Sequence, residues 1–205
     1  MTENNDNGAS KDAPLVMTKT WDLPLRLFHW GLASSVLIGW YFGEFRDFTT
    51  IEWHFYAGYV TACLLIFRLV WGFYGPPNAQ FKNIIPSRKD VSNYAKNLFT
   101  RKPSGFDGHN PIGGLSVAAL LIVLSLQIMT GFYAEDDGLF SSGPLSATAS
   151  TDWVLIANQL HHNGSRIILG LIILHLAAIL FYQIWKRENL IKPMITGKKM
   201  VRDKK

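Results

Sequence analysis

The stretch QLHHNGSRIILGLIILHLAAILFYQIW, residues 159 to 185, places histidines at the start and in the middle of an apolar run. His161 and His162 are adjacent, and His175 follows well inside the run. Ionisable side chains at membrane depth cost free energy, so they are candidates for a functional role. The stretch therefore predicts a membrane helix with a functional site built into it.

Apolar residues collect in four long blocks of the 205-residue chain, separated by segments that hold most of the charge. Each block is close to the ~20 residues that a helix needs to cross the hydrocarbon core of a bilayer. The alternative is a soluble helical bundle, but soluble helices normally show a polar stripe and these blocks do not. We therefore expect an all-α fold, a bundle of four transmembrane helices, with its spans at Leu25–Phe42, Phe55–Tyr74, Ile112–Tyr133 and Ile167–Trp185.

The distribution of basic residues predicts the orientation of this bundle. Lys and Arg concentrate in the loop between the second and third blocks and in the tail after the fourth. Apart from Arg166 at its last position, the loop between the third and fourth blocks has neither and carries four acidic residues instead. Because Lys and Arg are retained on the cytoplasmic side, both termini are expected to be cytoplasmic. The formal net charge of +5 thus reflects topology and contact with membrane lipid, and it does not indicate nucleic-acid binding.

The spacing within the opening stretch suggests two sites along one helix. His161 and His175 are fourteen residues apart, which falls about 40° short of four full turns, so both imidazoles lie on nearly the same face. Along the helix axis they are about 21 Å apart. His162 lies thirteen residues from His175, which places that pair roughly 140° apart. One face with two well-separated imidazoles suits two stacked cofactors.

Each cofactor would need a second ligand from another helix at the same depth. With the predicted orientation, His29 lies near the cytoplasmic start of the first span and His54 near the outer start of the second. The pairs are therefore His29 with His175 and His54 with His161. Two imidazoles per site, without thiolates or clustered carboxylates, fit the iron of a haem with two histidine ligands. Small residues near these histidines leave room for a flat macrocycle.

For other polar residues near the spans, the sequence gives weaker evidence of a functional role. His109 is interpreted as part of a helix-entry turn, and His162 as the extra histidine of its pair, not the ligand. Three arginines at span ends, near the predicted haem levels, either pair with haem propionates or extend toward the interface. They are Arg26, Arg68 and Arg166, of which Arg68 is the best propionate candidate because its neighbours are apolar.

The stretches WDLPLRLFHWGL (residues 21–32), WHFYAGYVTACLLIFRLVWGFYG (53–75) and HNPIGG (109–114), together with His161 and His175, resemble the bacterial cytochrome b561 family. This family includes the b-type cytochrome subunits of nickel–iron hydrogenases. The resemblance implies a four-helix cytochrome of the bacterial cytoplasmic (inner) membrane. It further implies two b haems whose ligands come from helices one, two and four. The expected organisation is a disordered polar tail over residues 1–20, a dihaem cytochrome b domain over 21–190 and a basic cytoplasmic tail over 191–205.

Two haems with both axial positions filled predict electron transfer, because neither iron has an open position for substrate. The leading hypothesis is an electron carrier between the quinone pool and a periplasmic c-type cytochrome, a hydrogenase-like protein or another redox partner. It is compatible with a homodimer. One alternative is a self-contained quinol or superoxide:quinone oxidoreductase. Another, from a different class, is a haem-free transporter whose histidines handle protons or ions.

Overall fold

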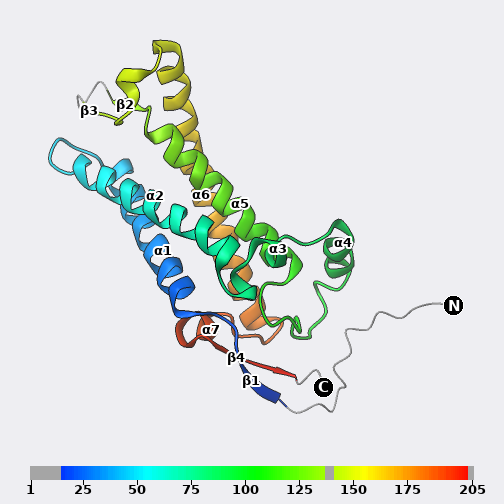
Figure 1. The fold of residues 1–205 in the computed structure, drawn as a ribbon. Helices are drawn as coiled ribbons and strands as arrows, with labels where there is room; N and C mark the ends of the chain where they lie inside the picture. Colours follow the sequence, from blue (N-terminus) through cyan, green and yellow to red (C-terminus); the bar gives the residue numbers. More distant parts are fainter. Residues whose placement is uncertain (1–14, 137–140, 203–205) are drawn as a thin grey trace.

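The computed structural model describes residues 15–136 and 141–202. Each of the four apolar blocks lies in one long helix, and these helices dominate the fold (Figure 1). They are α1 (Leu23–Glu44), α2 (Ile51–Tyr74), α5 (Pro111–Gly131) and α6 (Thr151–Ile184). Within the described residues, α2, α5 and α6 are long and apolar enough to cross a membrane. The prediction of a helical, multi-pass fold is therefore confirmed in part: the described chain is mostly helical, with short β ribbons besides, and has three candidate spans. A fourth span in α1 stays a prediction.

Local sequence signals set the ends of these helices. The side chain of Asn110 accepts a hydrogen bond from the backbone N–H of Gly113 at 2.8 Å, and Pro111 follows at the first helical position of α5. Asn at the N-cap and Pro in the first turn are both favoured at a helix start. At the other end of α2, Tyr74 is the last helical residue before the sequence Gly-Pro-Pro, because proline cannot continue a helix.

The helix α6 begins earlier than the sequence suggested. We expected the fourth span to start near Ile167, with His161 and His162 at or before its first turn, but α6 already begins at Thr151. Ser150 caps it by accepting a hydrogen bond from the backbone N–H of Trp153. The first ten residues of α6 are less apolar, so an apolarity criterion misses them. Both histidines consequently lie in the interior of one continuous 34-residue helix.

The long helices form two antiparallel hairpins, α1 with α2 and α5 with α6, and the main helix contact between the hairpins joins α2 to α5. Buried hydroxyl groups link the first hairpin, where Thr61 donates to the Oγ of Ser35 at 2.9 Å. Such interhelical hydrogen bonds are typical of helices packed in lipid. Leu65, Leu124 and Ile168 form a small buried cluster where α2, α5 and α6 meet.

Most large apolar side chains of the long helices point outward. Only 11% of the most apolar window of α5 is buried, and the same holds for α6. Side chains such as Ile122, Leu126 and Leu174 are more than half exposed. An exposed apolar surface this extensive would be unfavourable in water, so its solvent is the hydrocarbon of a bilayer.

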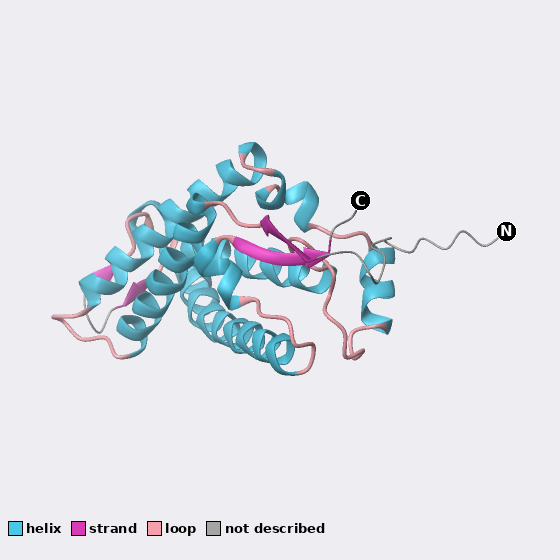
Figure 2. Ribbon diagram, turned by 90° about the horizontal axis from the view of Figure 1, so that it is seen from below, coloured by secondary structure: helices cyan, strands magenta, loops and turns pink. Residues whose placement is uncertain are grey.

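Short elements close the two ends of the helices. A two-stranded antiparallel ribbon of β1 (Leu15–Lys19) and β4 (Lys198–Arg202) lies at one end, with Met17 opposite Met200; Figure 2 shows it as the larger magenta pair. The small pair of β2 (Glu135–Asp136) and β3 (Ser141–Ser142) lies at the other end. The remaining elements are η1 (Pro77–Ala79), α3 (Phe81–Ile84), α4 (Arg88–Lys96), η2 (Ser146–Thr148) and α7 (Ile191–Thr196).

The ribbon adds structure to both expected tails. Residues 15–19 form β1, and residues 191–202 contain α7 and β4. Gly197 allows the turn between α7 and β4 because its φ is +77°, and its carbonyl accepts the backbone N–H of Thr20 at 2.9 Å. The expected disorder of residues 1–14 falls outside the described residues, as does the end of the basic tail at 203–205. The domain boundaries at 21 and 190 stay a prediction.

A buried ion pair holds the segments at the β1–β4 end together. Glu188 accepts hydrogen bonds from Lys199 Nζ at 2.8 Å and from the backbone N–H and hydroxyl of Ser104. Burial acts to raise the pKa of the Glu188 carboxyl, but the hydrogen bonds from Lys199 and Ser104 outweigh it and hold this pKa below its ordinary value. Glu188 therefore joins β4 and the loop before α5 to the end of α6.

Candidate functional site

Two histidines from different helices face each other toward the β2–β3 end. His54 lies one turn into α2, and His161 lies in α6. Their ring centres are 5.9 Å apart, with the ring planes at 86°. This is the pair that the sequence predicted from depth and spacing, and the structure places the two side chains together.

Backbone carbonyl groups orient both imidazoles of this pair. His54 Nδ1 lies 2.7 Å from the carbonyl oxygen of Gly39, and His161 Nδ1 lies 3.0 Å from that of Gln127. A carbonyl oxygen only accepts hydrogen bonds, so the proton of each ring belongs on Nδ1. The Nε2 lone pair of each ring is then available to a metal, which is the usual arrangement around histidine ligands.

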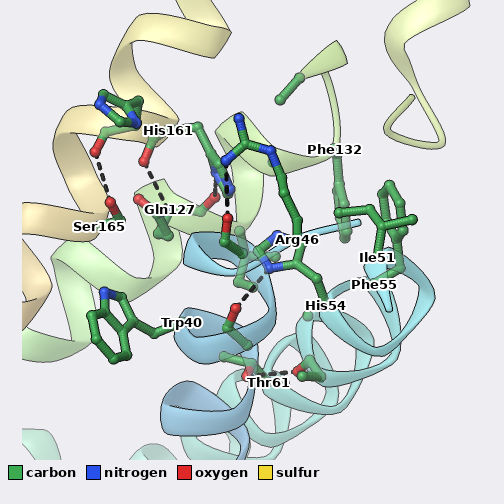
Figure 3. A pocket seen from close by; sticks show the side chains of 18 of the residues that line it. Trp40, Arg46, Ile51, His54, Phe55, Thr61, Gln127, Phe132, His161 and Ser165 are labelled. Carbon is green, nitrogen blue, oxygen red and sulfur yellow. Dashed lines mark hydrogen bonds between the residues drawn. The ribbon is translucent and has the colours of Figure 1, made fainter. Parts of the chain in front are cut away.

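A cavity of about 610 Å³ surrounds this pair (Figure 3). All four long helices line it, and its size is typical of a cofactor or ligand pocket. Two glycines keep the imidazoles in place, because a Cβ at Gly43 would lie 2.8 Å from His54 Nδ1 and one at Gly131 would lie 2.8 Å from His161 Cε1. Any larger residue at either glycine would push the ring out of its position.

A second histidine pair lies nearer the β1–β4 end. His29 of α1 and His175 of α6 have ring centres 6.5 Å apart, with their planes at 49°. Among the described residues, His29 Nδ1 is buried and has no hydrogen-bond partner. The two pairs therefore differ in how their rings are oriented.

The ring separations in both pairs suit one metal ion between two imidazoles. Metal–imidazole bonds are about 2 Å long, so two rings on opposite sides of one ion have centres roughly 6 Å apart. The observed values are 5.9 Å and 6.5 Å. In the part of the chain that the structure describes, no three His, Cys, Asp or Glu side chains gather as a metal cluster. Two imidazoles suffice for a haem iron, whose other ligands come from the porphyrin.

The three predicted arginines lie in different environments. Arg68 of α2 is only 2% exposed, its guanidinium is 4.6 Å above the ring of Phe81, and its Nη1 is buried without a partner among the described residues. Arg26 of α1 donates from Nη1 to the carbonyl of Ile195, while its Nε is also buried and unpartnered within the described segments. Arg166 is on the exposed surface of α6. Two of the three thus present unpaired buried donors.

The two remaining histidines near the spans also have clear positions. His109 lies just before α5 with its ring centre 4.7 Å from the indole of Trp21. Burial, helped by the positive charge of Arg68, lowers the pKa of His109 to about 4, so this ring is neutral at physiological pH. His109 thus lies at the entry to α5, as expected from the sequence, and its ring also packs against Trp21. His162 is exposed on α6 at the margin of the cavity.

Sequence reasoning missed two residues of the cavity. Gln127 contacts His161 through both its main chain and its side chain. Arg46 donates from Nε to Asp136 at 2.6 Å and from Nη1 to the carbonyl of Gly43, across the cavity's rim. Gln127 is the largest polar side chain in a charge-free span, and this unusual position was the signal that would have identified it. Arg46 carried no such signal, because it lies in a polar loop.

The exposed apolar helices and the paired imidazoles are features of the class of membrane b-type cytochromes. The chain belongs to the prokaryotic cytochrome b561 family, whose sequence model matches residues 20–197. The resemblance noted in the sequence is thereby confirmed. As a member of this family it is a membrane b-type cytochrome of electron transfer, and haem b is the cofactor that the family implies.

Curated relatives extend over nearly the whole chain. A probable Ni/Fe-hydrogenase B-type cytochrome subunit of Azotobacter vinelandii is 27% identical, over 96% of this chain and 94% of the relative. The corresponding protein of Bradyrhizobium diazoefficiens is 25% identical, over 89% and 86%. A probable Ni/Fe-hydrogenase 1 B-type cytochrome subunit of Escherichia coli K12 is 23% identical, over 91% and 92%. No solved structure is significantly similar to this chain.

Proposed function

We propose that the chain binds two haems b, each between two histidines, and carries electrons across the bacterial cytoplasmic membrane. The supporting observation is the presence of two imidazole pairs, each with one histidine from α6. Their ring centres are 6.5 Å and 5.9 Å apart. His29 and His175 would hold one haem, and His54 and His161 the other. Their levels are separated by about 21 Å of α6, the rise of fourteen helical residues.

The chain's own residues would bind and orient each cofactor. Arg68 and Arg26 offer unpaired buried donors near the His29–His175 pair, which suit the carboxylates of haem propionates. We propose the same role for Arg166 toward the propionates of the haem at His54 and His161. The apolar walls of the helices exclude water from the irons, and this, together with the ligands, sets their reduction potentials. Haem supplies the one-electron chemistry, while the helices fix the distance between the two redox centres.

This arrangement supports electron exchange between the quinone pool and a redox partner outside the cytoplasmic membrane. The relatives named as hydrogenase cytochrome subunits favour a hydrogenase-like partner. A c-type cytochrome is the alternative, because the exposed acidic side chains Glu135 and Asp152 near the β2–β3 end would attract a basic protein. We propose that α1 is a fourth span and that both termini are cytoplasmic, as the basic loops indicate.

A quinol-reduction experiment tests the link to quinone. The oxidised protein in detergent is mixed with excess quinol, and the b-type absorption band is followed in time. We expect quinol to reduce both haems and added quinone to reoxidise them. A protein that dithionite reduces but that quinol and quinone leave unchanged would contradict the link. The same sample mixed with superoxide tests the alternative of a self-contained oxidoreductase.

A further inference from the structure

The helix α5 contributes no histidine to either pair, yet it contacts one of the proposed ligands closely. Gln127 of α5 donates from Nε2 to the main-chain carbonyl of His161 at 2.9 Å. The main-chain carbonyl of Gln127 in turn accepts the Nδ1–H of His161 at 3.0 Å. The two hydrogen bonds run in opposite directions between the same two residues, so they clamp α5 to α6 at the imidazole.

We propose that Gln127 is the positioning residue for His161 and that α5 thereby tunes the cofactor held by His54 and His161. This inference rests on the proposed haem site. The carbonyl of Gln127 fixes the imidazole tautomer, because Nδ1 is the ring nitrogen that donates to it, which leaves Nε2 for the iron. The amide of Gln127 keeps this carbonyl within hydrogen-bond distance by holding the main chain of His161.

Packing leaves the clamp little freedom. A Cβ at Gly164 would lie 2.2 Å from Gln127 Oε1, and a Cβ at Gly131 would lie 2.8 Å from His161 Cε1. Gln127 Oε1 is itself buried and, among the described residues, has no hydrogen-bond partner. The amide is therefore held by its Nε2 bond and by close packing, and Figure 3 shows it beside His161 at the cavity.

Within the described residues, the other proposed haem site shows no such clamp. His29 Nδ1 has no hydrogen-bond partner within the described residues. A hydrogen bond from Nδ1–H to a carbonyl makes an imidazole a more basic ligand, and a more basic ligand stabilises the oxidised iron. Weakening the clamp is therefore expected to raise the reduction potential of the haem at His54 and His161 and to leave the other haem unchanged.

Two substitutions disturb the clamp in different ways. Gln127→Leu removes the amide while retaining the side-chain size, and Gly164→Ala displaces the amide while retaining every polar group. Ser125→Ala is the matched control, because Ser125 is an exposed residue of α5 whose hydroxyl donates to the carbonyl of Leu121 of its own helix. The readouts are the haem count per chain, a redox titration that resolves two haems, and the electron paramagnetic resonance spectrum of the oxidised protein.

We expect one of the two haems to titrate at a higher potential in Gln127→Leu and Gly164→Ala. The shift corresponds to about a tenfold change in the reduction equilibrium, or about 59 mV for a one-electron couple. The low-spin resonance signal of that haem should shift as well. Ser125→Ala should match the unsubstituted protein. In a His54→Ala background, which should retain only the other haem, Gln127→Leu should have no effect.

Three results would overturn the inference. They are two haems with unchanged or lower potentials in both variants, a shift confined to the haem of His29 and His175, or loss of both haems from both variants. The last result counts against positioning because a local clamp predicts that the other site survives. An unsubstituted protein without a second haem would instead contradict the proposed function.

Discussion

At the scale of single residues, the most specific assignment is the choice of His161, and not the adjacent His162, as a haem ligand. His161 faces His54 across the cavity, while its neighbour His162 is exposed. On a helix, adjacent residues point about 100° apart, so only one of the two can face the partner ring. The fourteen-residue spacing to His175 favours the same histidine. The assignment of His161 as a ligand stays a prediction that substitution can test.

We expect His161→Ala to lose the haem at His54 while retaining the other haem. His162→Ala should retain two haems, because the exposed His162 side chain points about 100° away from His161 around α6. Haem content per chain and the reduced spectrum of each purified variant measure this directly. The opposite outcome, in which His162→Ala loses a haem and His161→Ala does not, would reject the use of the helical spacing.

At the scale of elements, apolarity predicted where the long helices lie but not all of their ends. The expected end of the second span at Tyr74 is also the end of α2, because Pro76 and Pro77 stop the helix regardless of their neighbours. The start of α6 was missed, since its first turns, which Ser150 caps, mix apolar with polar residues and do not form an unbroken apolar block. The β1–β4 ribbon was also missed, because its strands are short, basic and separated by most of the chain.

Glu188 gives a prediction at the same scale, since it joins three separate segments. Glu188→Ala leaves the largely buried Lys199 unpaired, and breaking a buried ion pair in this way costs about 3–5 kcal/mol. We expect a clear drop in the thermal unfolding temperature in detergent, measured by circular dichroism. Glu52→Ala is the control, because Glu52 is exposed in the first turn of α2, and exposed sites usually change stability by no more than about 0.5 kcal/mol.

The same carboxyl predicts a pH dependence of stability. Because the folded-state pKa of Glu188 is lowered from its ordinary value of 4.5, its contribution is fully present above pH 4.5. It is lost as the pH falls below 4.5 through the folded-state pKa. The stability difference between the unsubstituted protein and Glu188→Ala should therefore shrink on acidification. A difference that stays constant or grows toward low pH would contradict this role.

At the scale of the whole molecule, the histidine pairs connect the two helical hairpins. Each pair takes one imidazole from the α1–α2 hairpin and one from α6. Expected depth and helical spacing were sufficient to predict which histidine side chains lie together, while their role as ligands stays a prediction. The clamp of Gln127 and the hydrogen bonds of Arg46 to Asp136 and Gly43 could not be predicted in this way. They depend on how α5 and the loops pack in three dimensions.

The orientation of the molecule is testable with reporter fusions. A fluorescent protein that matures only in the cytoplasm should be bright when fused at Lys102 or Lys205 and dark when fused at Thr49 or Ser142. Thr49 follows α1, so this position decides whether α1 spans the membrane. A bright fusion at Thr49 would contradict the four-span bundle, and a fully inverted pattern would contradict cytoplasmic termini.

The haem count is the measurement that tests the central claim most directly. The purified protein is assayed by pyridine haemochrome against protein concentration, together with a reduced-minus-oxidised spectrum. The two imidazole pairs predict two haems b per chain and b-type bands in the reduced spectrum. One haem per chain would contradict the two-pair arrangement, and a value near zero would contradict the cytochrome function altogether.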